Sequence, residues 1–304
     1  YDITVDGVLK VVTPLVDATN MNWNVTHDID LDAAVRSTGR WDIDVAGTSH
    51  FHHRIDGHNM FWRAVGLVTI DDVLNSMSNG TIDVSTSGPA AHINLTKDVF
   101  VSSGANSDGL GAGIIKLVSD QGSIRLDNIR FFGSGSHLKL SARGFTNQIV
   151  STVAALTATT TSATFADIVV RETDDLTIIG EDLTRDGVSN VTGVVTKFGL
   201  IDIKLLGQDA LLTLQSGNIA APTIGTTLTI TADDFDFLSG ENQIVSPGIF
   251  TIRATHDDVN YQLGSAGENI VGEDQSTLFR DSTVNLGVRD FAAMGDDFSL
   301  VLIG

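Results

Sequence analysis

A short apolar–polar–apolar pattern returns along this chain at intervals of a little over twenty residues. It is clearest in Ile93-Asn94-Leu95, Ile115-Lys116-Leu117 and Leu138-Lys139-Leu140, whose first residues lie 22 and 23 positions apart. Each segment has the alternation expected of a half-buried β-strand. A strand that returns at this interval indicates a solenoid, in which each coil of the chain stacks on the coil before it.

The pattern extends in both directions from these three segments. The other members of the series are Ile3-Thr4-Val5, Trp23-Asn24-Val25, Ile43-Asp44-Val45, Val68-Thr69-Ile70, Leu176-Thr177-Ile178, Ile201-Asp202-Ile203, Leu228-Thr229-Ile230 and Phe250-Thr251-Ile252. First residues are spaced by 20 to 27 positions, apart from one gap between Leu138 and Leu176. The sequence therefore predicts an all-β fold, a parallel β-helix (β-solenoid) with coils of about 20–27 residues.

The regularity of the series divides the chain into three parts. Residues 1–145 are predicted to form amino-terminal coils with a His- and Trp-rich start, and residues 146–172 an irregular Ala/Thr-rich junction. Residues 173–304 are predicted to form carboxy-terminal coils with a short helical turn near the end, within residues 290–294. A further short helix or bulged loop is expected at residues 70–77, where apolar residues have helical spacing.

Charge and cysteine content exclude several classes of function. The formal net charge is −20, from 38 acidic and 18 basic residues, which disfavours nucleic acid and anionic membranes as partners. No apolar run approaches the roughly 20 residues that span a bilayer, so we predict no membrane insertion. The chain has no cysteine, which rules out disulfides, zinc–thiolate sites and thiol catalysis.

The first residue of the chain is Tyr1 rather than Met. We therefore expect a processed chain or a piece of a longer polypeptide.

The acidic residues also suit hard cations. Carboxylates at expected corners, such as Asp182, Asp186, Asp257 and Asp258, offer the oxygen ligands that Ca²⁺ prefers. We keep Ca²⁺ as a candidate ligand and expect no other cofactor. The commoner consequence of such a charge is solubility and mutual repulsion.

Histidines cluster near the start of the chain. On a strand, His50 and His52 share one face, and together with His58 they could ligate Zn²⁺ or Cu²⁺ through imidazole nitrogen. Asp42 and Asp56 are the nearby carboxylates that could assist. The alternative is a polar strand edge with exposed imidazoles and no metal.

Several segments resemble the β-strand repeats of giant bacterial surface exoproteins of the filamentous-haemagglutinin-like family. The segments that carry this resemblance are Asp174 to Ile178, Gly199 to Ile203, Leu211 to Ile219, Leu228 to Phe237 and the closing Val284 to Gly304. The resemblance covers most of residues 80–304. It implies a right-handed parallel β-helix, at the cell surface or secreted, that serves in adhesion, biofilm matrix or an extracellular fibre. It implies no catalytic residues.

The repeats, the charge and the resemblance together predict a non-catalytic extracellular structural or adhesive protein. We expect it to be part of a larger exoprotein, or a filament of copies that join end to end by β-helix stacking. A glycan-binding fibre module is one alternative, in which exposed aromatics such as Trp41, Trp62, Phe51 and Tyr261 would stack on sugar rings. The same aromatics could instead fill the core.

A carbohydrate-active β-helix enzyme is the catalytic alternative. Such enzymes need clustered carboxylates for acid–base work, and the best cluster here is Asp233, Asp234 and Asp236. On a strand, Asp234 and Asp236 share a face opposite Phe235 and Phe237. The simpler interpretation is a solvated face opposite a core face, so we predict no enzymatic activity.

Overall fold

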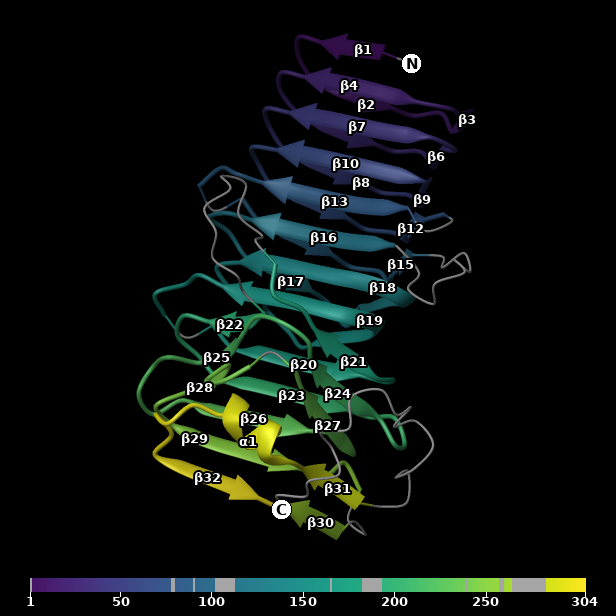
Figure 1. Cartoon of the computed structure of the whole chain (residues 1–304). Coiled ribbons are helices and arrows are strands. Elements are labelled where there is room, and N and C mark those ends of the chain that lie inside the picture. The colour runs from purple at the N-terminus through teal and green to yellow at the C-terminus, as the bar shows by residue number, and fades with distance from the viewer. Residues whose placement is uncertain are drawn as a thin grey trace. The chain divides into compact units, whose positions relative to one another are not determined.

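The predicted β-solenoid is confirmed. The computed structural model describes residues 2–77, 80–89, 91–101, 113–164, 166–181, 193–238, 240–256, 260–263 and 283–304. Parallel strands make up almost all of the regular structure in these residues. The chain divides into two compact units, Tyr1–Ala154 and Ala155–Gly304, and strands stack coil upon coil within each (Figure 1).

The amino-terminal unit has three columns of parallel strands. The first column contains β1 (Asp2–Val5), β4 (Met21–Val25), β7 (Arg40–Val45), β10 (Asn59–Ala64), β13 (Thr81–Thr86) and β16 (Ile114–Ser119). The second contains β2 (Leu9–Val11), β5 (Ile29–Leu31), β8 (Ser49–Phe51), β11 (Val68–Ile70), β14 (Ile93–Leu95) and β17 (Ile124–Leu126). The third contains β3 (Leu15–Ala18), β6 (Val35–Ser37), β9 (Ile55–Gly57), β12 (Leu74–Ser76) and β15 (Val99–Val101), and β18 (Arg130–Ala142) continues both it and the first column.

The alternation in sequence becomes an alternation of faces. In β4, Met21, Trp23 and Val25 point inward and are buried, whereas Asn22 and Asn24 are exposed. The same apolar ladder runs through the other columns and removes its side chains from water, which is the main force that holds the coils together. Outward positions carry the polar side chains and any site they form.

Coil length differs from the prediction because the predicted series mixes two columns. Ile43 lies in the first column, but Val68 and Ile93 lie in the second, and Ile115 returns to the first. True register partners in the first column are Ile3, Trp23, Ile43, Trp62, Val84, Leu117 and Leu140, at steps of 20, 20, 19, 22, 33 and 23 residues. Every column has the same alternation, so the pattern alone cannot assign a strand to its column.

The carboxy-terminal unit repeats the three-column plan. The first column contains β20 (Ile168–Glu172), β23 (Ile201–Leu205), β26 (Thr227–Thr231), β29 (Ile249–Arg253) and β32 (Leu300–Ile303). The second contains β21 (Leu176–Ile178), β24 (Leu211–Leu214) and β27 (Asp234–Phe237), and the third β22 (Val194–Thr196), β25 (Ile219–Ala220) and β28 (Ile244–Val245). The end of β19 (Ile149–Thr160) pairs with β21 and β22, and β30 (Asn260–Leu263) pairs with β31 (Thr283–Leu286).

Two local expectations differ from the structure. The Ala/Thr-rich stretch at 146–172 contains the boundary between the two units, as predicted, but it is not irregular, because it contains all of β19 and β20. Residues 70–77 are not helical, because β12 lies there and its Leu74 and Ser76 are buried. In both places pairing with neighbouring coils outweighs the local pattern.

The helical turn near the end of the chain is confirmed. Helix α1 (Val288–Ala293) contains the buried Asp290, whose Oδ2 accepts a hydrogen bond from the Gly287 backbone N–H at 2.8 Å. Its Oδ1 accepts another from the Phe237 N–H at 3.0 Å, which ties the helix to β27. No helix in the described part of the chain is long and apolar enough to cross a membrane.

Candidate functional site

The outward face of the second column carries the candidate site. Lys10, Asp30, His50 and Thr69 occupy successive register positions on β2, β5, β8 and β11. One turn of the coil therefore places residues about twenty positions apart in sequence at the ~4.8 Å spacing of neighbouring strands. His52 and Asp71 directly follow the register partners Phe51 and Ile70, so they also lie on neighbouring coils.

His50, His52 and Asp71 come together on this face. The Nε2 atom of His50 lies 2.6 Å from Oδ2 of Asp71, and Nδ1 of His52 lies 4.0 Å from the same oxygen. The two imidazole rings have centroids 3.7 Å apart. One nitrogen or oxygen of each residue lies within 4.8 Å of the others, which is a geometry that can hold a metal ion.

Asp30 supports the same group from the preceding coil. Its Oδ1 lies 3.0 Å from Nε2 of His52, and its Oδ2 accepts a hydrogen bond from Nζ of Lys10 at 3.1 Å. The hydrogen bond from Lys10 is the main cause that holds the pKa of Asp30 below its ordinary value. Asp30 is therefore a carboxylate that stays ionised and can orient the His52 ring.

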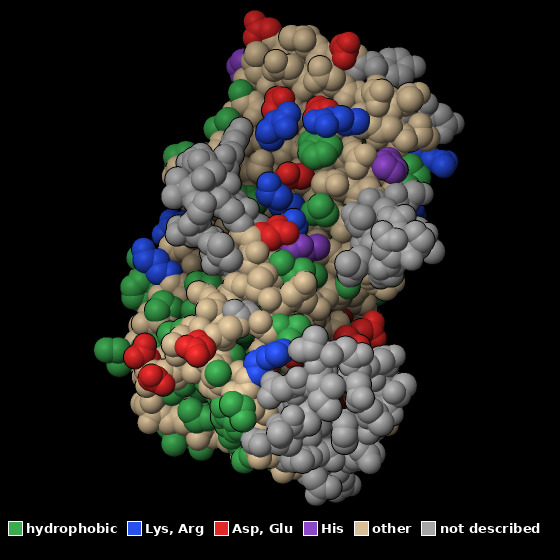
Figure 2. Space-filling model, in the orientation of Figure 1, with side chains coloured by type: hydrophobic (Ala, Val, Ile, Leu, Met, Phe, Trp, Pro, Cys, Tyr) green, Lys and Arg blue, Asp and Glu red, His purple; other side chains and the backbone are tan. Residues whose placement is uncertain are grey.

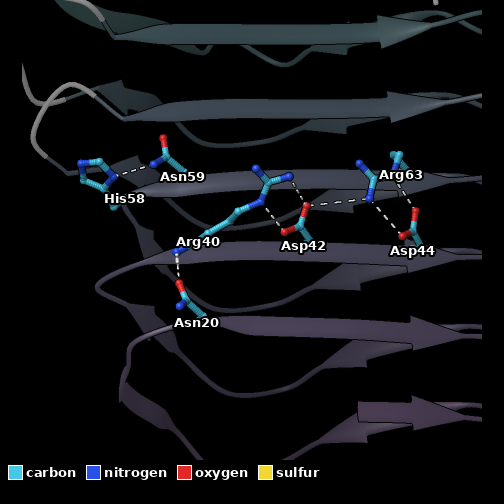
Figure 3. Close-up of polar contacts among 7 residues, drawn as sticks. All are labelled: Asn20, Arg40, Asp42, Asp44, His58, Asn59 and Arg63. Atoms are coloured by element: carbon cyan, nitrogen blue, oxygen red, sulfur yellow. Dashed lines mark hydrogen bonds and ion pairs between the residues drawn. The ribbon is translucent and has the colours of Figure 1, made fainter. Parts of the chain in front are cut away.

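The predicted third ligand, His58, is not part of this group. Its Nδ1 lies 2.8 Å from Nδ2 of the neighbouring Asn59 (Figure 3). The two carboxylates expected to assist are also engaged elsewhere. Asp42 pairs with Arg40, and Asp56 accepts hydrogen bonds from Arg54 and Asn75. Burial alone would raise the pKa of Asp56, but these hydrogen bonds outweigh it and the pKa lies below its ordinary value.

A ladder of ion pairs covers the outward face of the first column. Arg63 donates to both carboxylate oxygens of Asp44, at 2.6 and 3.0 Å, and lies 3.8 Å from Asp42. Arg40 pairs with Asp42 (Figure 3). The guanidinium of Arg40 also lies 4.3 Å above the ring of Phe61. Acidic and basic side chains accordingly lie close together over the strands of this unit (Figure 2). Such pairs neutralise one another and leave this face without a strong field of one sign.

The structure places the proposed sugar-binding tryptophans in the core. Trp41 and Trp62 are 1% and 3% exposed, so neither ring can stack on a sugar from outside, and the expectation that they are surface residues is wrong. Phe51 is also buried. The alternation of inward and outward side chains along a strand explains why these rings are buried, because Trp41 and Trp62 lie at inward positions of β7 and β10.

Two features of the surface escaped the sequence analysis. Phe100 and Phe132 are register partners at outward positions, and their rings stack with centroids 4.8 Å apart. The sequence signal for this stack was Phe100, an apolar residue at the position of Val99-Phe100-Val101 where a polar residue is expected.

The second feature is Asp71. The sequence analysis missed it as a partner of His50 because it lies 21 residues away, and only the register of the coils brings the two residues together.

The acidic cluster of Asp233, Asp234 and Asp236 lies directly before β27 and along it. Asp234 and Asp236 do share the face opposite the buried Phe235 and Phe237. Burial, and next the charge of Asp290, raise the pKa of Asp236 above its ordinary value. Asp233 instead anchors corners: its Oδ2 accepts from the Asp209 N–H at 2.9 Å and lies 2.8 Å from Nδ1 of His256.

The proposed Ca²⁺ ligands cannot be placed. Asp182, Asp186, Asp257 and Asp258 all lie outside the described residues. Ca²⁺ binding therefore stays a prediction from sequence.

Comparison of the chain with protein-family models, curated proteins and solved structures finds no match. The resemblance to filamentous-haemagglutinin-like exoproteins thus stays a prediction. The fold itself allows both enzymes and non-enzymes, so function has to be argued from the surfaces and the ends of the solenoid.

Proposed function

We propose that this chain is a non-catalytic structural and adhesive module of an extracellular or cell-surface protein, and that further β-solenoid coils, from a larger exoprotein or from other copies, stack on it. The observation that carries the proposal is the open interior of the first coil. Coils of a solenoid bury their apolar interior against neighbouring coils.

The first coil leaves its inward side chains half-exposed. Ile3 and Val5 occupy the inward positions of β1, and their register partners Trp23 and Val25 on the next coil are 0% and 1% exposed. Burial of such apolar area is worth about 25 cal/mol per Å². One further coil of the same pattern would therefore stabilise this end.

The last strand of the carboxy-terminal unit, β32, also leaves apolar side chains exposed. On β32, Val301 and Ile303 continue the inward ladder of Phe250 and Ile252 on β29. Val301 is 40% exposed, and its neighbours Leu300 and Leu302 are exposed as well. Hydrophobic side chains are visible over the region of β29 and β32 (Figure 2). A contact between the first coil of one copy and β32 of another copy would cover both apolar surfaces, and because it joins unlike surfaces it would repeat from copy to copy.

Electron microscopy and sedimentation of the full native chain test the proposal. We expect end-to-end assemblies that lengthen with protein concentration. Replacing Ile3 and Val5 together by Lys puts charge into the open interior and should abolish assembly. Thr4→Lys is the matched control, because Thr4 lies on the same strand but points outward, so assembly should persist. Single particles at every concentration, or assembly insensitive to Ile3→Lys/Val5→Lys, would contradict the proposal.

A glycan-binding module is the second candidate, and the Phe100–Phe132 stack favours it. Two parallel outward rings offer the flat apolar surface that sugar rings bind. Glycan-array binding that is lost in Phe132→Ala, in a chain that stays monomeric, would support this candidate over the filament. Binding to glycans that survives this substitution would remove the stack from consideration.

A further inference from the structure

We propose that His50, His52 and Asp71 bind one first-row transition-metal dication of the Zn²⁺ type, and that Asp30 positions His52 for this role. The proposal does not depend on whether the module forms filaments. Its ligands are two imidazole nitrogens and one carboxylate oxygen, a donor set that suits Zn²⁺ and related ions rather than Ca²⁺.

The distances between the ligand atoms bracket those of a bound ion. Ligands about 2.0–2.1 Å from a tetrahedral Zn²⁺ lie about 3.3 Å from one another. Around Oδ2 of Asp71, the two nitrogens lie at 2.6 Å (His50) and 4.0 Å (His52). Small rotations of these side chains would equalise the two distances. All three are partly exposed, with side-chain exposures of 42%, 35% and 36% for His50, His52 and Asp71, so such rotation meets little packing.

Asp30 selects the tautomer that metal binding needs. Its Oδ1 lies 3.0 Å from Nε2 of His52, and an acceptor at this place favours a proton on Nε2. The Nδ1 lone pair, on the Asp71 side of the ring, is then free to coordinate. This carboxylate–histidine–metal arrangement recurs in metal sites, where the outer carboxylate orients the ring and raises its basicity.

The charges also favour a cation. Asp71 supplies one negative charge to two imidazoles that coordinate in the neutral form, and Lys10 offsets the charge of Asp30. With three protein ligands, a tetrahedral ion keeps one open position on the exposed side. Water, or a donor from another molecule, would fill it.

Titration calorimetry with ZnCl₂ on the full chain, prepared without a polyhistidine tag, tests the proposal. We expect one Zn²⁺ per chain. The double substitution His50→Gln/His52→Gln should weaken binding by at least about 100-fold, and Asp30→Asn by about 10–100-fold, the usual effect of losing an outer carboxylate. Asp71→Asn should also weaken binding, because the amide is a poorer ligand than the carboxylate.

The matched control is His53→Gln/His58→Gln. It removes the same number of histidines from the same region, but His53 pairs with Asp32 and His58 contacts Asn59. Its affinity for Zn²⁺ should be unchanged. Tryptophan fluorescence checks that each variant is folded, and Zn²⁺ should raise the unfolding midpoint of the native chain and of the control only. Absence of one-to-one binding, or equal loss in both double variants, would overturn the proposal.

Discussion

The indole rings of Trp23 and Trp41 meet edge to face inside the amino-terminal unit, with centroids 5.2 Å apart. Trp62 extends the cluster, with its centroid 6.2 Å from that of Trp41. These are the only tryptophans in the chain. Their fluorescence therefore reports the unfolding of this unit alone, and two of the predictions below use it.

Truncation of Trp41 should strongly destabilise the amino-terminal unit. Trp41→Ala removes a side chain that is 1% exposed and leaves a cavity, so we expect a loss of about 3–5 kcal/mol in the free energy of unfolding. Trp41→Phe should cost less, because it keeps an aromatic ring and removes a buried Nε1–H that has no hydrogen-bond partner among the described residues. Urea unfolding followed by the remaining tryptophans measures both. A loss below about 1 kcal/mol for Trp41→Ala would show that the residue is not core.

Stability should fall below neutral pH partly because of His92. Burial, and next the charge of Arg125, lower its pKa from the ordinary value of 6.5, and its Nδ1 accepts a hydrogen bond from the Ser123 N–H at 2.9 Å. Below pH 6.5 the unfolded chain therefore binds more protons at this residue than the folded chain does. The contribution of His92 to the free energy of unfolding is complete above pH 6.5 and is lost as the pH falls below that value. His92→Asn can keep an acceptor near the same position but does not titrate.

The test compares urea unfolding at pH 7.5 and 5.5. The native chain should lose more stability between these values than His92→Asn. His53→Asn is the control, because it removes another histidine from the same unit, and this side chain is more exposed than His92. Identical pH dependence in His92→Asn and the native chain would contradict the assignment.

Loss of the Asp290 carboxylate should loosen β27. In Asp290→Ala the backbone N–H groups of Phe237 and Gly287 lose their acceptor, at a cost of about 1–3 kcal/mol for a buried donor. Hydrogen–deuterium exchange at residues 234–238 should accelerate. Asp297→Ala removes an exposed carboxylate from a nearby turn and should leave the exchange unchanged. Equal protection in Asp290→Ala and the native chain would show that water replaces the carboxylate.

Neutralising Asp236 should instead stabilise the carboxy-terminal unit at pH 7. Its pKa is raised by burial and by Asp290, so the folded state holds the proton more tightly than the unfolded state does. The contribution of protonated Asp236 to the free energy of unfolding is therefore present at low pH, and it is lost as the pH rises through the pKa of the folded state. Asp236→Asn should therefore resist unfolding better than the native chain at pH 7 and show no advantage at pH 3. An advantage of the same size at both pH values would point to packing rather than charge.

The sequence predicts the strands well because strand alternation is local. Segments such as Ile93-Asn94-Leu95 and Ile124-Arg125-Leu126 show which residues point inward, and both are strands with buried ends. The same local signal misleads at residues 70–77, where apolar spacing fits a helix but pairing with β9 and β15 imposes a strand. It also cannot distinguish one column from the next, which is why the predicted series moves from Ile43 to Val68.

The candidate site was likewise only partly predictable from local sequence. That His50 and His52 share a face follows from their spacing of two residues, so the sequence could bring these two ligands together. Asp71 and Asp30 join them from the following and the preceding coil, and their places depend on coil lengths that vary from 19 to 33 residues in the first column. A shift of one residue in that register would turn either carboxylate to the interior.

Sequence by itself determined that this protein is a β-solenoid with a polar, acidic outer surface, because inward and outward positions alternate residue by residue. The tertiary structure decided which outward residues meet, that Trp41 and Trp62 are buried, and that the first coil and β32 leave apolar side chains exposed. These facts depend on how each coil registers on the next, and register is set by backbone pairing between residues about twenty positions apart, which no local pattern encodes.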